Sequence, residues 1–143
     1  MFRIIGQYEI NRDGDVIRVW STSEFNLEAA RQYALDMIAM IEQMPPTFGT
    51  LVEFDAPPII GPEVEEAMRR SAHQRAERGM VAVAFVTRNL EGITVARGQW
   101  NRIYEGSGVT LQFFTDVGAA RQWLQEQIDQ ARGSGQIVTQ SVH

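Results

Sequence analysis

Apolar residues recur along the chain with two different periods, and the changes of period divide it into strands and helices. Near the start, the β-prone runs from Gln7 to Ile10 and from Val16 to Trp20 flank the segment Arg-Asp-Gly-Asp at positions 12–15. Asp-Gly between two such runs favours a tight turn. The pattern therefore predicts an N-terminal β-hairpin.

Four later segments have apolar residues three or four positions apart, which is the spacing of a helix with one buried face. The first helix is predicted to start after Asn26, a suitable N-cap, and to end before Pro45. The second runs from Pro62 to Arg78, because proline suits the first helical position, where the missing N–H would have no partner. The other two are predicted around 93–105 and after Asp116.

The predicted helix 62–78 has glutamates in its first turn and arginines at positions 69, 70, 75 and 78. This order suits the helix dipole, and it predicts the ion pairs Glu65–Arg69 and Glu66–Arg70. Positions 64, 67, 68, 71 and 72 form the predicted inner face. The arginines are therefore expected on the solvated face.

Three short apolar runs predict strands at 49–55, 80–87 and 109–116. The run at 80–87 has almost no alternation, as in a strand that is covered on both faces of a parallel sheet. Strands that alternate with helices imply right-handed crossovers. We predict a single α/β domain over residues 1–132, with a mainly parallel four- to five-stranded sheet, an N-terminal hairpin and about four helices. Residues 133–143 are expected to form a flexible C-terminal tail.

The composition narrows the classes of function. The net charge is −5 and the pI is about 5.0, and without a concentrated basic face the attraction for nucleic acid is absent. The chain has neither cysteine nor lysine, which excludes disulfides, thiolate catalysis, P-loop lysines and Schiff bases. No apolar run has the length of a membrane span or of a signal peptide, so we expect a cytoplasmic protein.

The last predicted strand and the helix after it resemble the same part of a known protein family. The aromatic strand TLQFFTD leads through an acidic turn into VGAARQWLQEQI, a helix with Ala120, Trp123 and Leu124. This ending, with the hairpin before the first helix, resembles the SpoIIAA-like family of small bacterial proteins, which has the STAS fold of anti-sigma-factor antagonists. The resemblance covers about residues 5–131.

The resemblance implies a non-enzymatic regulatory module that acts through protein contacts, and we expect a homodimer. In the phosphoswitch members of the STAS group, a partner kinase phosphorylates a serine at the start of the helix after the second parallel strand. That serine would fall near Ile60, Gly61 or Pro62, but no hydroxyl residue lies between Asp55 and Ser71. The phosphoswitch therefore does not carry over to this chain.

The alternative function comes from a structural likeness between that family and Sec14-type lipid-binding domains. It implies a carrier or sensor of a small apolar or lipid-like ligand, held between the sheet and a helix. A chain of 143 residues leaves little volume beyond a packed core. The two functions therefore stay open at this point.

Three polar residues each end a predicted strand and should meet at the carboxyl edge of the sheet, where open α/β sheets bind ligands. Aspartate and threonine also serve as turn and cap residues at such places. A second candidate surface is the apolar segment before the second helix. The possible ligand or partner surface consists of Asp55, Pro57, Pro58, Ile59, Ile60, Thr87 and Asp116.

No motif identifies catalytic, cofactor-binding or metal-binding residues. His73 is predicted to point to solvent, and the chain offers it no second ligand nearby. An enzyme that uses the carboxylates at the sheet edge is the third and least favoured function. Large aromatic residues are expected mostly in the core, with an exposed patch for self-association as the alternative; they are Trp20, Trp100, Phe113 and Phe114.

Overall fold

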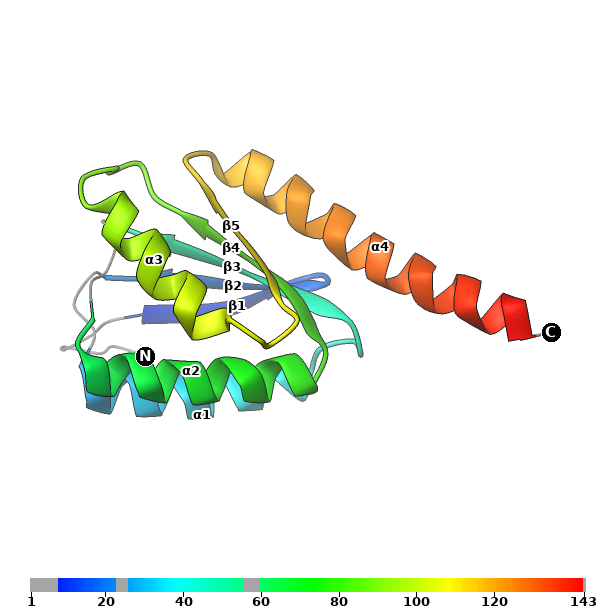
Figure 1. The fold of residues 1–143 in the computed structure, drawn as a ribbon, viewed down its shortest axis with the longest axis horizontal. Helices are drawn as coiled ribbons and strands as arrows, with labels where there is room; N and C mark the ends of the chain where they lie inside the picture. Colours follow the sequence, from blue (N-terminus) through cyan, green and yellow to red (C-terminus); the bar gives the residue numbers. More distant parts are fainter. Residues whose placement is uncertain (1–7, 23–25, 56–59, 143) are drawn as a thin grey trace.

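The computed structural model describes residues 8–22, 26–55 and 60–142, and side chains as far as residue 133. It forms an α/β domain with a five-stranded sheet (Figure 1). The elements in chain order are β1 (Tyr8–Asp13), β2 (Val16–Ser21), α1 (Leu27–Ile41), β3 (Phe48–Phe54), α2 (Pro62–Glu77), β4 (Met80–Val86), α3 (Ile93–Tyr104), β5 (Thr110–Phe114) and α4 (Val117–Val142). This confirms the predicted fold class.

The strands lie in the sheet in the order in which they occur along the chain, β1-β2-β3-β4-β5. β1 and β2 are antiparallel, joined by a turn in which Gly14 has a positive φ of 61°. The other neighbours are parallel. The arrangement is consistent with a STAS-like topology.

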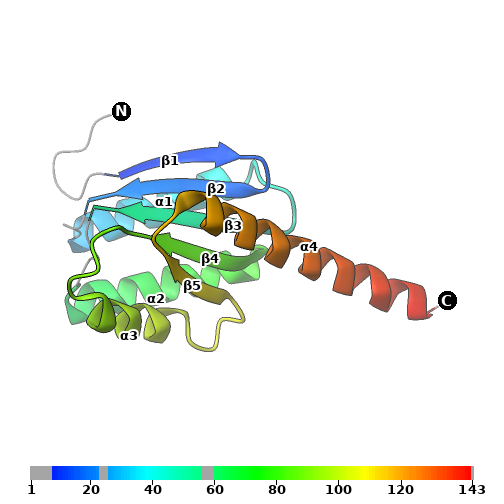
Figure 2. The ribbon, with the colours of Figure 1, turned by 90° about the horizontal axis from the view of Figure 1, so that it is seen from above.

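The helices α1, α2 and α3 cover one face of the sheet, and α4 covers the other (Figures 1 and 2). A right-handed crossover to the next strand always leaves its helix on the same side when the strands advance in one direction. α1, α2 and α3 therefore share a face, and α4, which follows the last strand, packs on the opposite face against β3 and β4.

The predicted cap of the first helix is confirmed, and a glycine ends the second helix. Asn26 caps α1, since its side-chain oxygen accepts a hydrogen bond from the Ala29 N–H at 2.8 Å. Gly79 ends the second helix with a φ of +116°, and a Cβ there would lie 1.9 Å from the Pro46 carbonyl oxygen. Only glycine fits this approach, which brings the starts of β3 and β4 together.

The sheet separates two cores. The larger one lies beneath α1, α2 and α3 and includes Phe48, Phe85 and Trp100. The smaller one lies beneath α4 and includes Leu51, Leu124 and other small or aliphatic side chains. The strand β4 contributes to both, as its uninterrupted apolar sequence predicts.

α4 continues through Val142 and projects beyond the sheet (Figures 1 and 2). Its backbone is thus helical where a tail is predicted, and the flexibility of 133–143 stays a prediction. In the described part of the chain, no helix combines the length and hydropathy that a bilayer crossing needs.

Candidate functional site

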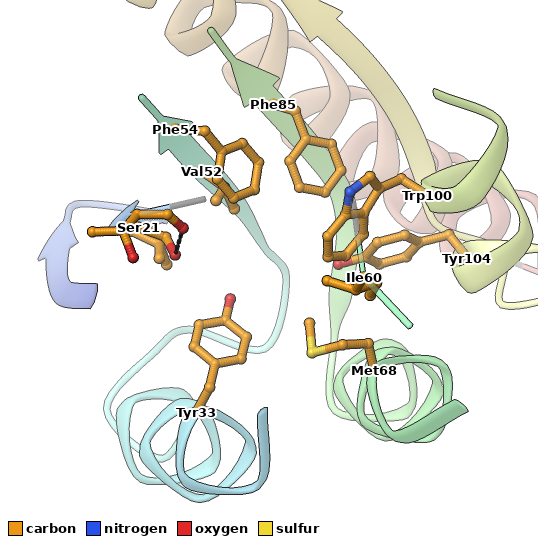
Figure 3. Close-up of a pocket in the computed structure, with 11 residues that line it drawn as sticks. Ser21, Tyr33, Val52, Phe54, Ile60, Met68, Phe85, Trp100 and Tyr104 are labelled. Atoms are coloured by element: carbon orange, nitrogen blue, oxygen red, sulfur yellow. Dashed lines mark hydrogen bonds between the residues drawn. The ribbon is translucent and has the colours of Figure 1, made fainter. Parts of the chain in front are cut away.

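A pocket opens between the sheet and the three helices on its α1–α3 face (Figure 3). The side chains that surround it come from the carboxyl halves of β2, β3 and β4, from α1, α2 and α3, and from the segment before α2. They are Val19, Ser21, Thr22, Tyr33, Val52, Phe54, Ile60, Met68, Phe85, Trp100 and Tyr104. The pocket therefore forms only when most of the fold is in place.

Aromatic rings make up one wall of this pocket. Phe54 stacks on Phe85 with ring centroids 5.6 Å apart, and Phe85 meets Trp100 at 5.0 Å. Phe85 also has an edge contact with Tyr104, at 6.3 Å. Such rings give a wall that is rigid and apolar, and each ring is fixed by its neighbours.

The free volume of the pocket is about 30 Å³, which is far below the ~300–1,000 Å³ of most small-molecule sites. A ligand larger than a few atoms must therefore displace side chains. Met68 and Ile60 stand at the helical side of the space in Figure 3. Methionine is unbranched and adapts its shape easily, so Met68 is the side chain best able to make room.

A few polar groups face this apolar space. Figure 3 shows the Tyr33 hydroxyl directed into it, and Ser21 at its rim, where its hydroxyl donates to the Thr22 carbonyl at 3.0 Å. Burial raises the pKa of the Tyr33 hydroxyl above its ordinary value, although the Arg75 guanidinium beside it acts in the opposite direction. The hydroxyl is therefore protonated at neutral pH.

The indole N–H of Trp100 is an unusual polar group within the pocket wall. Trp100 is 4% exposed, and its Nε1 has no hydrogen-bond partner. The nitrogen lies on the side of the indole that faces Phe85 (Figure 3). A buried donor without a partner costs about 1–3 kcal/mol, so this group requires an explanation.

A buried arginine lies behind the pocket. Arg75 on α2 is 1% exposed, and its guanidinium donates to the Ser71 hydroxyl and, at 3.0 Å, to the Tyr104 hydroxyl. It also lies over the Tyr33 ring, with 5.6 Å between Cζ and the ring centroid. Tyr33 and Tyr104 are pocket residues, so this charge lies directly behind the pocket wall.

The position of Arg75 corrects the prediction that the arginines of this helix lie on its solvated face. Positions 64, 68, 71 and 75 continue one helical row, and all four are buried. The helical spacing in the sequence places Arg75 on the buried face, but its charge favoured an exposed position. In the described residues, no carboxylate lies within ion-pair distance of this guanidinium.

The segment before α2 is fixed to α3 by one side chain. Gln99 is buried, and its amide accepts from the Ile60 N–H at 3.0 Å and donates to the Ile60 carbonyl at 2.6 Å. Both backbone groups of Ile60 are thereby satisfied although the residue is buried. Gln99 thus holds one side of the pocket in place.

The predicted ion pairs on α2 are wrong in their partners. Glu65 pairs with Arg102 of α3 at 3.0 Å and accepts from Gln99 at 3.1 Å, and these hydrogen bonds lower its pKa below the ordinary value. Glu66 pairs with Arg69 at i,i+3. The acidic first turn therefore ties α2 to α3 as well as complementing the helix dipole.

The seven residues predicted as a ligand or partner surface lie in different surroundings. Asp55, Thr87 and Asp116 follow β3, β4 and β5 at one edge of the sheet. Asp116 caps α4 by accepting from the Ala119 N–H at 2.8 Å, and the Thr87 hydroxyl accepts from the Asn89 N–H at 3.3 Å in a turn. Ile60 lines the pocket.

Asp55 is exposed after β3. Pro57, Pro58 and Ile59 lie outside the described residues. The predicted surface as a whole therefore stays a prediction, with Ile60 as the member that reaches the pocket.

The four large aromatic residues are distributed over both faces. Trp100 is buried in the pocket wall, and Phe113 packs against the same core. Phe114 packs with Trp123 on the α4 face, and Trp20 is 37% exposed. They therefore do not form one surface patch.

His73, predicted to point to solvent, is partly buried, and its Nε2 lies 3.2 Å from the Glu105 carbonyl oxygen. Among residues 8–22, 26–55 and the described part from 60 onward, no three histidine or acidic side chains are grouped in a way that could hold a metal ion.

No family model, curated protein or solved structure matches this chain.

Proposed function

We propose that this chain is a non-enzymatic binding module of the STAS/SpoIIAA-like type, and that it carries or senses a small apolar ligand. The pocket on the α1–α3 face is the observation that supports this function. Its walls are aromatic and aliphatic, and only a few polar groups converge on it, which is the composition of a binding site for small molecules. We place the protein in the cytoplasm.

The experiment that tests this function measures binding of small apolar probes. Benzene and 1-hexanol should raise the melting temperature, because a ligand that binds only the folded state stabilises it by about 1.4 kcal/mol at ten times its Kd. Native mass spectrometry of protein purified from cells should show a co-purified small molecule.

The matched variants are Ser21→Leu and Leu35→Ala. Ser21 is buried at the rim of the pocket, so leucine there should fill the space and abolish the shift in melting temperature. Leu35 is 66% exposed on α1 and away from the pocket lining, so its replacement should leave binding unchanged. Failure of every probe to bind, with no compound co-purified, would contradict the proposal.

A second candidate function is a regulatory protein–protein interaction module that forms a homodimer. It is favoured by two large apolar side chains close together in sequence at the start of α3, Leu90 and Val95, which are 54% and 58% exposed. Exposed apolar side chains of this size suit a contact surface.

Light scattering coupled to size-exclusion chromatography tests the homodimer. A dimer should become monomeric in the variant Val95→Arg, because a charge would be placed in the contact, while Leu35→Ala should stay dimeric. A wild-type protein that remains monomeric at high concentration would contradict this candidate.

A further inference from the structure

We propose that the pocket selects an apolar molecule with a carboxylate, and that the carboxylate accepts a hydrogen bond from Trp100 Nε1 in the field of Arg75. The inference rests on the proposed function, since it names the class of ligand for the same pocket. It is carried by two buried groups that the fold itself leaves incompletely satisfied.

The first group is the Trp100 indole. Its N–H is a donor and nothing else, so the group that satisfies it must be an acceptor. The nitrogen is fully buried, on the Phe85 side of a ring that lines the pocket (Figure 3). A purely hydrocarbon ligand would leave this donor without a partner, whereas an oxygen of a carboxylate would satisfy it.

The second group is the Arg75 guanidinium. It is buried, it always carries a positive charge, and its hydrogen bonds go to the neutral hydroxyls of Ser71 and Tyr104. Its Nε has no partner. A buried charge is normally paired, so an uncompensated positive potential remains behind the pocket wall.

Two pocket residues connect this charge to the pocket. Tyr104 lines the pocket and accepts from Arg75. Tyr33 also lines the pocket, with its hydroxyl directed into the space, and the guanidinium lies over its ring. An anionic group placed beside Trp100 would therefore lie near a positive charge in a region of low dielectric, where the attraction is strong. A neutral acceptor gains the hydrogen bond but not this attraction.

The apolar body of the ligand is expected to lie against the aromatic wall. The small free volume, about 30 Å³, requires Met68 to move as the ligand enters. The shared chemistry is a carboxylate on an apolar body, and this chemistry is common to short-chain acids and to long-chain fatty acids. Chain length is therefore one arm of the test.

The test follows the indole N–H signals of ¹⁵N-labelled protein by NMR. The chain has three tryptophans, and the signals are assigned with the variants Trp100→Phe and Trp123→Phe. Hexanoate is titrated at neutral pH, with hexanamide as the uncharged molecule of the same length and dodecanoate as the long-chain acid. The Trp100 signal should move downfield and saturate with hexanoate, while the Trp20 and Trp123 signals stay in place.

The expected affinity for hexanoate exceeds that for hexanamide by at least about tenfold, because only the acid interacts with the charge of Arg75. Trp100→Phe, which keeps an aromatic ring and removes the donor, should weaken hexanoate binding by about tenfold. Trp123→Phe is the matched control on the other face and should bind hexanoate as the wild type does. Arg75→Met should bring the two affinities close together.

Each outcome supports or overturns the inference. Equal binding of hexanoate and hexanamide, or binding that leaves the Trp100 signal unmoved, would overturn it while the proposed function stands. Failure of hexanoate, hexanamide, dodecanoate, benzene and 1-hexanol alike, with no compound co-purified, would overturn both. The comparison of acid and amide needs only the wild-type protein, so it remains decisive if Arg75→Met does not fold. Tighter binding of dodecanoate would identify the source as a fatty acid, and tighter binding of hexanoate a short-chain acid.

Discussion

The two faces of the sheet are packed by different means. On the α4 face, small and aliphatic side chains such as Ala82, Ala84 and Leu124 form a core without buried charge. On the α1–α3 face, the core contains stacked aromatic rings, a buried arginine and an indole donor without a partner. The same strands therefore support two environments with different chemistry.

The α4 face is close-packed where its strand residues are small, as at Gly49, Ala82 and Ala84. A Cβ at Gly49 would lie 3.0 Å from the Leu124 side chain, so the helix approaches the sheet at that point as closely as the backbone permits. The α1–α3 face instead keeps a pocket and polar groups. One face therefore mainly stabilises the fold. The other contains buried polar groups that are not fully hydrogen-bonded, which lowers stability, and a ligand could satisfy them.

The largest effect is expected from Leu124→Ala. Leu124 is fully buried on the α4 face, and the tight packing there prevents collapse around the cavity, so the free energy of unfolding should fall by about 2–5 kcal/mol. Urea denaturation measures the change, with the exposed Leu35→Ala as control. A loss below about 1 kcal/mol would show that this face is not the close-packed one.

A smaller loss is expected from Tyr104→Phe on the opposite face. It removes one hydroxyl that accepts from Arg75, and leaving a buried charged donor unpaired should lower the free energy of unfolding by about 1–3 kcal/mol. The double variant Arg75→Met with Tyr104→Phe should recover most of this loss, since no charge is left to satisfy. Equal costs for the single and double variants would contradict the role assigned to the arginine.

The smallest expected effect is a dependence of stability on pH, which involves one carboxylate on each side of the sheet. On the α4 side, the Arg132 hydrogen bond holds the pKa of Asp15 below its ordinary value of 3.8, and Gln125 adds to this. On the α1–α3 side, hydrogen bonds from Arg102 and Gln99 lower the pKa of Glu65 below 4.5. A lowered pKa contributes stability that is complete above the ordinary value and is lost as the pH falls through the lower, folded-state value.

Asp15→Asn and Glu65→Gln should therefore each reduce the acid-induced loss of stability below pH 4.5, by less than about 1 kcal/mol because these pairs are partly exposed. Thermal unfolding at a series of pH values measures the effect. High salt should bring the curves together, since salt screens exposed pairs. Variants that match the wild type at every pH would show that the pairs contribute nothing.

The periodicity of the sequence predicts the elements well because each signal is local. The hairpin turn, the Asn26 cap, the proline start of α2 and the doubly covered strand β4 depend on neighbours within a few residues. What the sequence could not predict depends on partners far away. Glu65 pairs with a helix 37 residues further along, although a suitable arginine stands one turn away.

The set of residues that lines the pocket was beyond prediction for the same reason. Its walls come from three strands and three helices, and no periodic pattern states which side chains from different elements meet. Arg75 is a different case, because its helical spacing indicated burial and its charge indicated exposure. Arg75 is buried because it contacts the hydroxyls of Ser71 and Tyr104 and the ring of Tyr33. Of these three partners, only Ser71 is near in the sequence.

The order of the strands has a consequence for the kinetics of folding. Each strand from β2 to β5 pairs with the one that precedes it along the chain, so the sheet grows by contacts of short sequence separation, which favours rapid folding. The fourth helix departs from this pattern. Its Arg121 and Arg132 reach Asp13 and Asp15 of the hairpin across 108 and 117 residues, so a ribosome must release almost the whole chain before these pairs can form.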